Sequence, residues 1–92
     1  MERLLMLVTL SVEVPHLGPR IKAAREASGK SPTAIAALAG MSVANLYRIE
    51  SEDTKSIPRE TLKRLSEALG VDFDAEVKAA LLEAIQNAEA AT

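Results

Sequence analysis

Apolar and polar residues alternate along the N-terminal segment of the chain. Between Leu4 and Val14 every even position is apolar, whereas the odd positions change from leucine to threonine, serine and glutamate. A period of two is typical of a β-strand that buries one face, and Pro15 ends the pattern. We therefore expect an N-terminal strand whose apolar face consists of Leu4, Met6, Val8, Leu10, Val12 and Val14.

The same apolar run does not fit a targeting segment. A membrane-crossing helix needs about 20 apolar residues, and this run is shorter. The residues that follow Leu10 include no pair of small side chains suited to signal-peptide cleavage. We expect a cytoplasmic protein that makes no contact with a membrane.

From Leu17 onward the apolar residues recur at the three- and four-residue spacing of amphipathic helices. Ser31 and Ser42 precede two of these segments and are suited to accept the free amides of a helix start. Asp72 or Asp74 occupies the same place before the last segment, and glycine follows three of the others. The predicted helices span residues 18–28, 32–39, 43–51, 58–69 and 75–90.

The second and third predicted helices have a more specific arrangement. Two short capped helices lie between Ser31 and Glu50, with Gly40 in the turn that joins them. This is the helix-turn-helix arrangement, whose second helix fits a DNA major groove about 12 Å wide. Any hairpin of two short helices would share the spacing, so the pattern alone also allows an ordinary solvated hairpin.

The chain from Leu17 to Phe73 resembles the Cro and lambda-repressor-like helix-turn-helix regulators, on the segments IKAAREASGKSPTAIAALAGMSVANLYRIE and IPRETLKRLSEALGVDF. Together with the N-terminal pattern, this predicts a mainly α fold in three parts. Residues 1–16 form a dimerisation strand, and residues 17–73 form the helix-turn-helix DNA-binding domain. Residues 74–92 form a C-terminal helix that packs on this domain or on the dimer interface and completes a five-helix lambda-repressor-like DNA-binding fold. The positions that carry the resemblance are Arg25, Gly29, Ala36, Gly40, Ser42, Ile49, Glu50 and residues 68–71.

The resemblance also implies roles for individual residues. Arg25 on the first helix would form a salt bridge with Glu50 at the end of the recognition helix. Arg48 would read guanine through two hydrogen bonds, and Asn45 would read adenine or hold a phosphate. On an isolated helix, these two residues would simply form a solvated polar face. The complete set of expected DNA contacts is Lys30, Thr33, Ser42, Val43, Ala44, Asn45, Tyr47, Arg48, Lys55 and Arg59.

Two features depart from the family pattern. Pro32 stands where the family usually has a glutamine that holds a backbone phosphate. The loop after Glu50 is longer and contains Glu52 and Asp53, which would repel a phosphate that they faced. Either DNA is bound weakly, or the loop turns its acids outward and presents Lys55.

The N-terminal strand has no predicted partner within the chain. An unpaired strand leaves its backbone groups without hydrogen bonds. Pairing with the same strand of a second copy, as an antiparallel ribbon about a twofold axis, satisfies them. We expect the fifth helix to support this ribbon through Val77, Leu81 and Ile85. A homodimer would also present two recognition helices, which must lie about 34 Å apart to read successive major grooves.

Composition narrows the chemistry further. The chain has 92 residues, no cysteine, a single histidine, His16, and a net charge of −2. Disulfides and thiolate metal sites are therefore excluded. With one imidazole we expect no metal, no cofactor and no enzymatic activity. The charge is uneven, since residues 17–69 carry 9 lysines and arginines against 6 acids, a net charge of +3, and residues 70–92 carry 1 against 5, or −4.

The sequence thus predicts a sequence-specific regulator of transcription that binds double-stranded DNA. The most economical form is a homodimeric repressor of a palindromic operator. The alternative is a protein-interaction module, such as an antitoxin-like partner of a second regulatory protein, that keeps the fold and binds DNA weakly.

Overall fold

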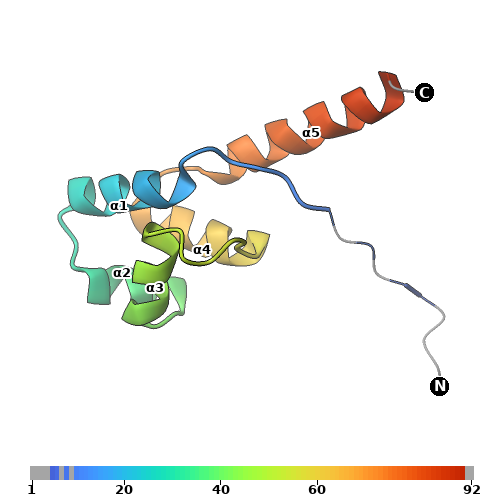
Figure 1. The fold of residues 1–92 in the computed structure, drawn as a ribbon. Helices are drawn as coiled ribbons and strands as arrows, with labels where there is room; N and C mark the ends of the chain where they lie inside the picture. The colour runs from blue at the N-terminus through green and yellow to red at the C-terminus, as the bar shows by residue number, and fades with distance from the viewer. Residues whose placement is uncertain (1–4, 7, 9, 91–92) are drawn as a thin grey trace.

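The computed structural model describes residues 5, 6, 8 and 10–90 of the chain, and five helices occupy most of this part (Figure 1). All five correspond to predicted helices, with ends that differ by at most one residue. The helices are α1 (Leu17–Ser28), α2 (Pro32–Ala39), α3 (Val43–Glu50), α4 (Arg59–Leu69) and α5 (Asp74–Ala90).

Side-chain caps set three of the helix starts. The Ser31 and Ser42 hydroxyls accept hydrogen bonds from the amides of Ala34 and Asn45, each at 3.1 Å. Of the two acids before the last helix, Asp72 is the cap, since its carboxylate accepts from the Ala75 amide at 3.1 Å. These serines replace water at amides that have no partner within the helix, which defines where α2 and α3 begin.

An aliphatic core joins the first four helices. Ile21, Ile35, Leu46 and Leu65 are fully buried, and each comes from a different helix. Phe73, which follows α4, is also buried and closes the core beneath α5. The inner face of α3 is therefore held by packing, while its outer face remains exposed.

The N-terminal arm (residues 1–16) is only partly packed on this body at its described residues, 5, 6, 8 and 10–16. Val12 and Val14 are half-buried against the core, whereas Met6, Val8 and Leu10 are 72–89% exposed. Leu4, the first residue of the expected strand face, lies outside the described residues. No strand is found in the described part of the arm, so the predicted strand and its pairing are not confirmed.

Helix α5 leaves the body after its first two turns (Figure 1). Arg59 donates two hydrogen bonds to the Asp74 carboxylate, at 2.8 and 3.1 Å. Arg20 pairs with Glu76 in the same way, and its guanidinium lies 5.6 Å from the centre of the Phe73 ring. Two ion pairs thus fasten the start of α5 to α4 and α1.

The apolar contacts of α5 end soon after these ion pairs. Val77 is buried and Leu81 is half-buried against the core, but Ile85 is 49% exposed. Of the three residues expected to support the ribbon, two therefore contact the body of their own chain and Ile85 does not.

Helix α1 and helix α3 are joined by the ion pair that the resemblance implies. Arg25 donates to both carboxylate oxygens of Glu50, at 2.7 and 2.9 Å. Both side chains are almost completely buried, with 11% and 4% of their surface exposed. The hydrogen bonds to Glu50 raise the pKa of Arg25 above its ordinary value, so the guanidinium stays charged.

Breaking this pair should destabilise the domain strongly. Arg25→Met leaves the Glu50 carboxylate buried without a counter-charge, which should lower the free energy of unfolding by about 3 kcal/mol. Thermal or urea unfolding measures the change, with Lys22→Met as the control because Lys22 is exposed on the same helix. An unchanged melting temperature in Arg25→Met would refute this role of the pair.

The attachment of α5 should depend on pH. Hydrogen bonds from Arg59 and Arg20 hold the pKa values of Asp74 and Glu76 below their ordinary values of 3.8 and 4.5. A lowered pKa in the folded chain stabilises the fold at neutral pH, and this contribution is lost as the pH falls below the ordinary values and through the lowered ones. Glu76→Gln should therefore melt below the wild type at pH 7, and the difference should vanish in strong acid. Glu83→Gln, on the exposed part of α5, is the control; a difference that persisted in strong acid would contradict the account.

Candidate nucleic-acid interface

Helix α3 presents a polar outer face. Leu46, Ile49 and Glu50 point into the body and are buried, whereas Asn45 and Arg48 are exposed. The side chains of Asn45 and Arg48 make no hydrogen bond or ion pair with any residue that the structure describes. Their donors and acceptors are therefore free for a ligand that lies along α3.

The remaining residues expected on α3 are not equally available. Ala44 is exposed, and Tyr47 is 48% exposed. Val43 is half-buried and packs against the core, so most of its apolar surface is already used. Ser42 uses its hydroxyl as the helix cap. Val43 and Ser42 could contact DNA only through the edge of the side chain or through the backbone.

The turn between α2 and α3 fixes how the two helices meet. Gly40 has a φ of 71°, in the left-handed region that glycine adopts without strain. The Met41 amide donates to the Ala36 carbonyl at 2.9 Å, which closes the end of α2. Ala36 is 2% exposed, as expected for a small residue where the two helices approach. The helix-turn-helix geometry follows from these two small residues.

The three cations expected to bind phosphates have different partners. Lys30 donates to the Ala68 carbonyl at the end of α4, at 3.4 Å, and Arg59 is paired with Asp74. Lys55 is exposed and forms no ion pair within the described part of the chain. Thr33 is exposed in the first turn of α2. Of the three cations, Lys55 is the one that makes no side-chain hydrogen bond or ion pair with another described residue.

The two acids of the α3–α4 loop lie in different surroundings. Glu52 turns back to the start of α1, where its Oε1 accepts a hydrogen bond from the Gly18 amide at 3.2 Å. Asp53 stays exposed and lines a shallow groove of about 450 Å³ together with Lys22, Tyr47 and Arg48. Asp53 is therefore the acid that lies beside Arg48 and would repel a phosphate there, whereas Glu52 points toward α1.

Sequence reasoning did not find this contact of Glu52. It joins residues 34 positions apart, and no spacing rule links them. The available signal was a glycine in the first turn of α1, where a side chain would ordinarily favour the helix.

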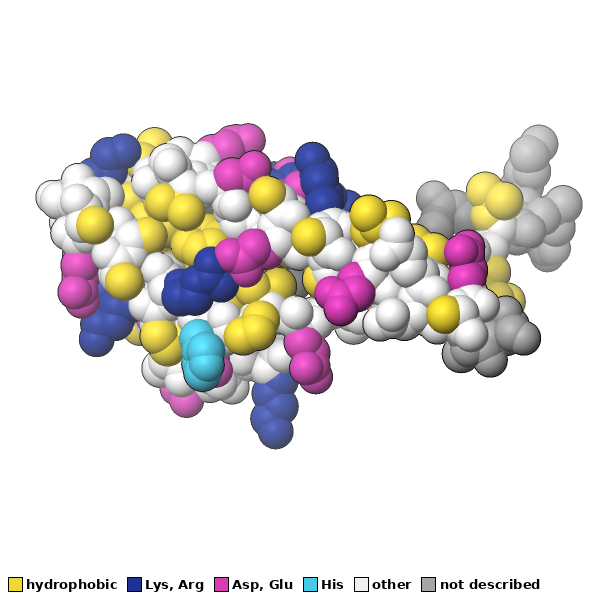
Figure 2. All heavy atoms as spheres, turned by 90° about the horizontal axis from the view of Figure 1, so that it is seen from above, with side chains coloured by type: hydrophobic (Ala, Val, Ile, Leu, Met, Phe, Trp, Pro, Cys, Tyr) yellow, Lys and Arg dark blue, Asp and Glu magenta, His cyan; other side chains and the backbone are white. Residues whose placement is uncertain are grey.

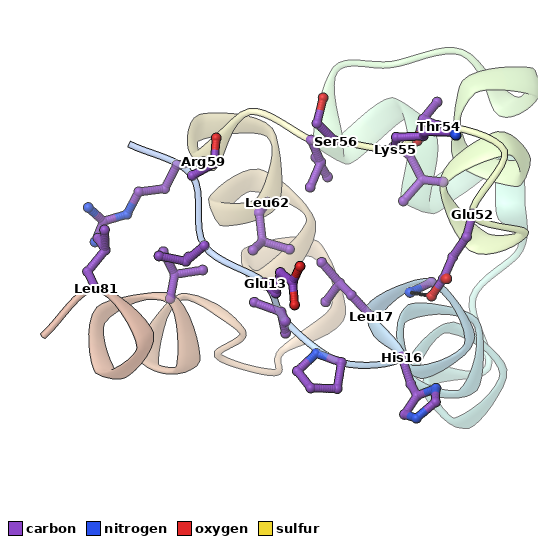
Figure 3. A pocket seen from close by; sticks show the side chains of 18 of the residues that line it. Glu13, His16, Leu17, Glu52, Thr54, Lys55, Ser56, Arg59, Leu62 and Leu81 are labelled. Carbon is purple, nitrogen blue, oxygen red and sulfur yellow. Dashed lines mark hydrogen bonds between the residues drawn. The ribbon is translucent and has the colours of Figure 1, made fainter. Parts of the chain in front are cut away.

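A larger cleft of about 860 Å³ lies at the base of the arm (Figure 3). One wall is the arm from Leu10 to His16, and the other includes Leu62, Val77 and Leu81. Hydrophobic side chains also continue on the surface from the body onto the narrow extension at one end of the molecule (Figure 2). Apolar side chains are thus also exposed outside the core that the single chain buries.

Two other kinds of site are not found in the described residues. No group of histidine, aspartate and glutamate side chains among them could hold a metal ion. None of their helices has both the length and the apolar character needed to span a membrane.

The comparisons with known proteins agree with this geometry. A family model described as a helix-turn-helix domain matches residues 16–80, which include α1 to α4 and the packed start of α5. Neither the curated proteins nor the solved structures include a significant match. The family match covers well over half of the chain and confirms the resemblance: this protein belongs to the helix-turn-helix domain family.

Proposed function

We propose that the protein is a sequence-specific transcriptional regulator that binds a palindromic operator in double-stranded DNA as a homodimer. In this role it acts in the cytoplasm as a repressor, by occupying the operator, and it is not an enzyme. The observation that carries the proposal is the outer face of α3, where Asn45 and Arg48 are exposed and unpaired among the described residues.

The two side chains suit the edges of base pairs. A guanidinium can donate two hydrogen bonds to the O6 and N7 of guanine, and an amide can pair with the N6 and N7 of adenine. Ala44, beside Asn45, is small enough to contact a thymine methyl group. Arg48 and Asn45 are three positions apart and therefore lie on one side of α3, so both can enter the same groove.

Phosphate contacts would fix the orientation of the domain. Lys55 and the first turn of α2 near Thr33 are exposed. Lys30 already donates one hydrogen bond to the Ala68 carbonyl, and the charge of Arg59 is balanced by Asp74, so both would contribute less than Lys55. With Asp53 exposed nearby, binding should be modest and sensitive to salt.

The dimer contact that we propose is the arm. No backbone-to-backbone hydrogen bond joins residues 10–15 to any other described residue. The apolar face that is half-buried at Val12 and Val14 continues as exposed surface at Met6, Val8 and Leu10. The arm of a second copy would satisfy the backbone groups and cover this face, and the cleft at the base of the arm offers space beside it.

A second candidate is a protein-interaction module, with a second regulatory protein as its partner. Leu82 and Ile85 favour it, because they are 57% and 49% exposed on the part of α5 that leaves the body. In this case duplex DNA would bind weakly or not at all.

Replacing Arg48 tests the proposed function. Arg48→Ala should weaken binding to the selected operator by about 1–3 kcal/mol and relax the preference for one base pair in each half-site. Competition binding with a panel of substituted duplexes measures both effects. Lys78→Ala removes the same charge from α5 and should leave the base preference unchanged. An Arg48→Ala variant with unchanged preference would rule out this residue as a base reader.

Charged substitutions on the arm test the dimer. Val8→Asp combined with Leu10→Asp should give a monomer with unchanged helical content, because both side chains are exposed in the single chain. Ser11→Asp, on the opposite face of the alternating pattern, should remain dimeric. Sedimentation or light scattering gives the mass; a dimer that survives the double substitution, or the removal of residues 1–14, would show that the arm is not the contact.

A further inference from the structure

The start of α1 lies directly against the end of α3. A Cβ atom on Gly18 would be 2.6 Å from both the Ile49 carbonyl oxygen and the Cγ atom of Glu52, and 2.7 Å from the Glu50 carbonyl oxygen. Real Cβ atoms do not approach a backbone oxygen so closely. Only glycine at this position allows the two helices to meet at this distance.

Glu52 provides the cap that α1 otherwise lacks. His16, at the N-cap position, makes no side-chain hydrogen bond to the helix. Instead, the carboxylate of Glu52, in the loop after α3, accepts a hydrogen bond from the Gly18 amide. We call this contact between the start of α1 and the end of α3 the α1–α3 junction. Figure 3 shows Glu52 pointing from the loop after α3 toward the start of α1. A carboxylate at a helix start is stabilised by the free amides and by the positive end of the helix dipole.

Backbone strain is concentrated at the α1–α3 junction. Among the described residues, the non-glycine residues with positive φ are His16, at 53°, and Glu52, at 59°. His16 directly precedes α1, and Glu52 follows α3 by two positions. Such conformations cost free energy and persist where the surrounding contacts enforce them, which is typical of functional positions.

The α1–α3 junction connects the arm to α3, and a DNA-binding dimer must hold these two parts of the chain in a fixed relative orientation. The arm runs directly into α1 through His16, and α3 carries Asn45 and Arg48. The Arg25–Glu50 pair joins the same two helices further along α1. Two contacts along α1 restrain both the position and the direction of α3.

We propose that the contact between Gly18 and Glu52 sets the orientation of α3 relative to the arm, and thereby the separation of the two recognition helices in the dimer. Glu52 is a positioning residue in this arrangement. The inference rests on the proposed homodimer, but it concerns geometry that exists before DNA is bound.

The absence of native cysteine allows a direct test. Ala44→Cys on the exposed face of α3 introduces one spin-label site in each subunit. Electron–electron distance measurements on the free dimer should give a narrow distribution near the ~34 Å that successive major grooves require. Adding Glu52→Ala or Gly18→Ala should broaden or shift this distribution. Glu52→Gln keeps an acceptor oxygen and should show the narrow distribution of the wild type. Asp53→Ala removes the neighbouring charge and should leave the distribution unchanged.

DNA binding gives a second readout. The ratio of affinities for a palindromic operator and a single half-site should fall by about tenfold in Glu52→Ala, within the range usual for coupled sites. Asp53→Ala removes a charge that faces solvent, so it should change both affinities alike and leave the ratio unchanged. Circular dichroism checks that each variant is folded; if Gly18→Ala does not fold, the glutamate variants carry the test.

The outcomes separate this inference from the proposed function. Unchanged distances and an unchanged affinity ratio in Glu52→Ala would overturn the positioning role and leave the regulator standing. Altered distances in a dimer that binds no duplex DNA would support the positioning role and overturn the regulator. A monomeric wild type would overturn both.

Discussion

The buried ion pair between Arg25 and Glu50 is the interaction on which the position of α3 depends. Helix α3 has only eight residues, too few to be stable alone in water. Its inner face packs on the core through Leu46 and Ile49, but apolar packing tolerates small rotations that two hydrogen bonds between planar groups do not. The pair therefore fixes the orientation of α3 as well as stabilising the fold. The Glu52 cap at the start of α1 adds a second restraint on α3.

The distribution of charge follows from the same contacts. Several groups that the sequence presents as free charges are used inside the chain: Arg59 and Arg20 hold the start of α5, and Glu52 caps α1. The exposed charges beside α3 are a small set: Lys22, Arg48 and Asp53 line the shallow groove, and Lys55 follows in the loop. The overall charge of −2 is thus a poor guide to the interface, because most of the excess acid lies after residue 70.

Local features of the fold could be predicted from the sequence, and contacts between distant residues could not. Ser31, Gly40 and Ser42 mark the helix-turn-helix because caps and turns depend on neighbours a few residues away. The Arg25–Glu50 pair was accessible through the family resemblance. The contacts of Glu52 and Arg59 were not, because a charged residue can reach many partners and periodicity does not select one. The strand pattern of the arm remains a prediction, since a strand forms only where a second strand pairs with it.

Selection of duplexes from a random DNA pool tests whether the protein reads a DNA sequence as a dimer. The wild-type protein should enrich a palindrome whose half-sites are one helical turn apart, about 34 Å. Its affinity should fall with salt by a log–log slope of about −0.9 for each phosphate contact. If no duplex is enriched at low salt, or the enriched sequences lack twofold symmetry, the account of a dimeric, sequence-reading regulator is wrong.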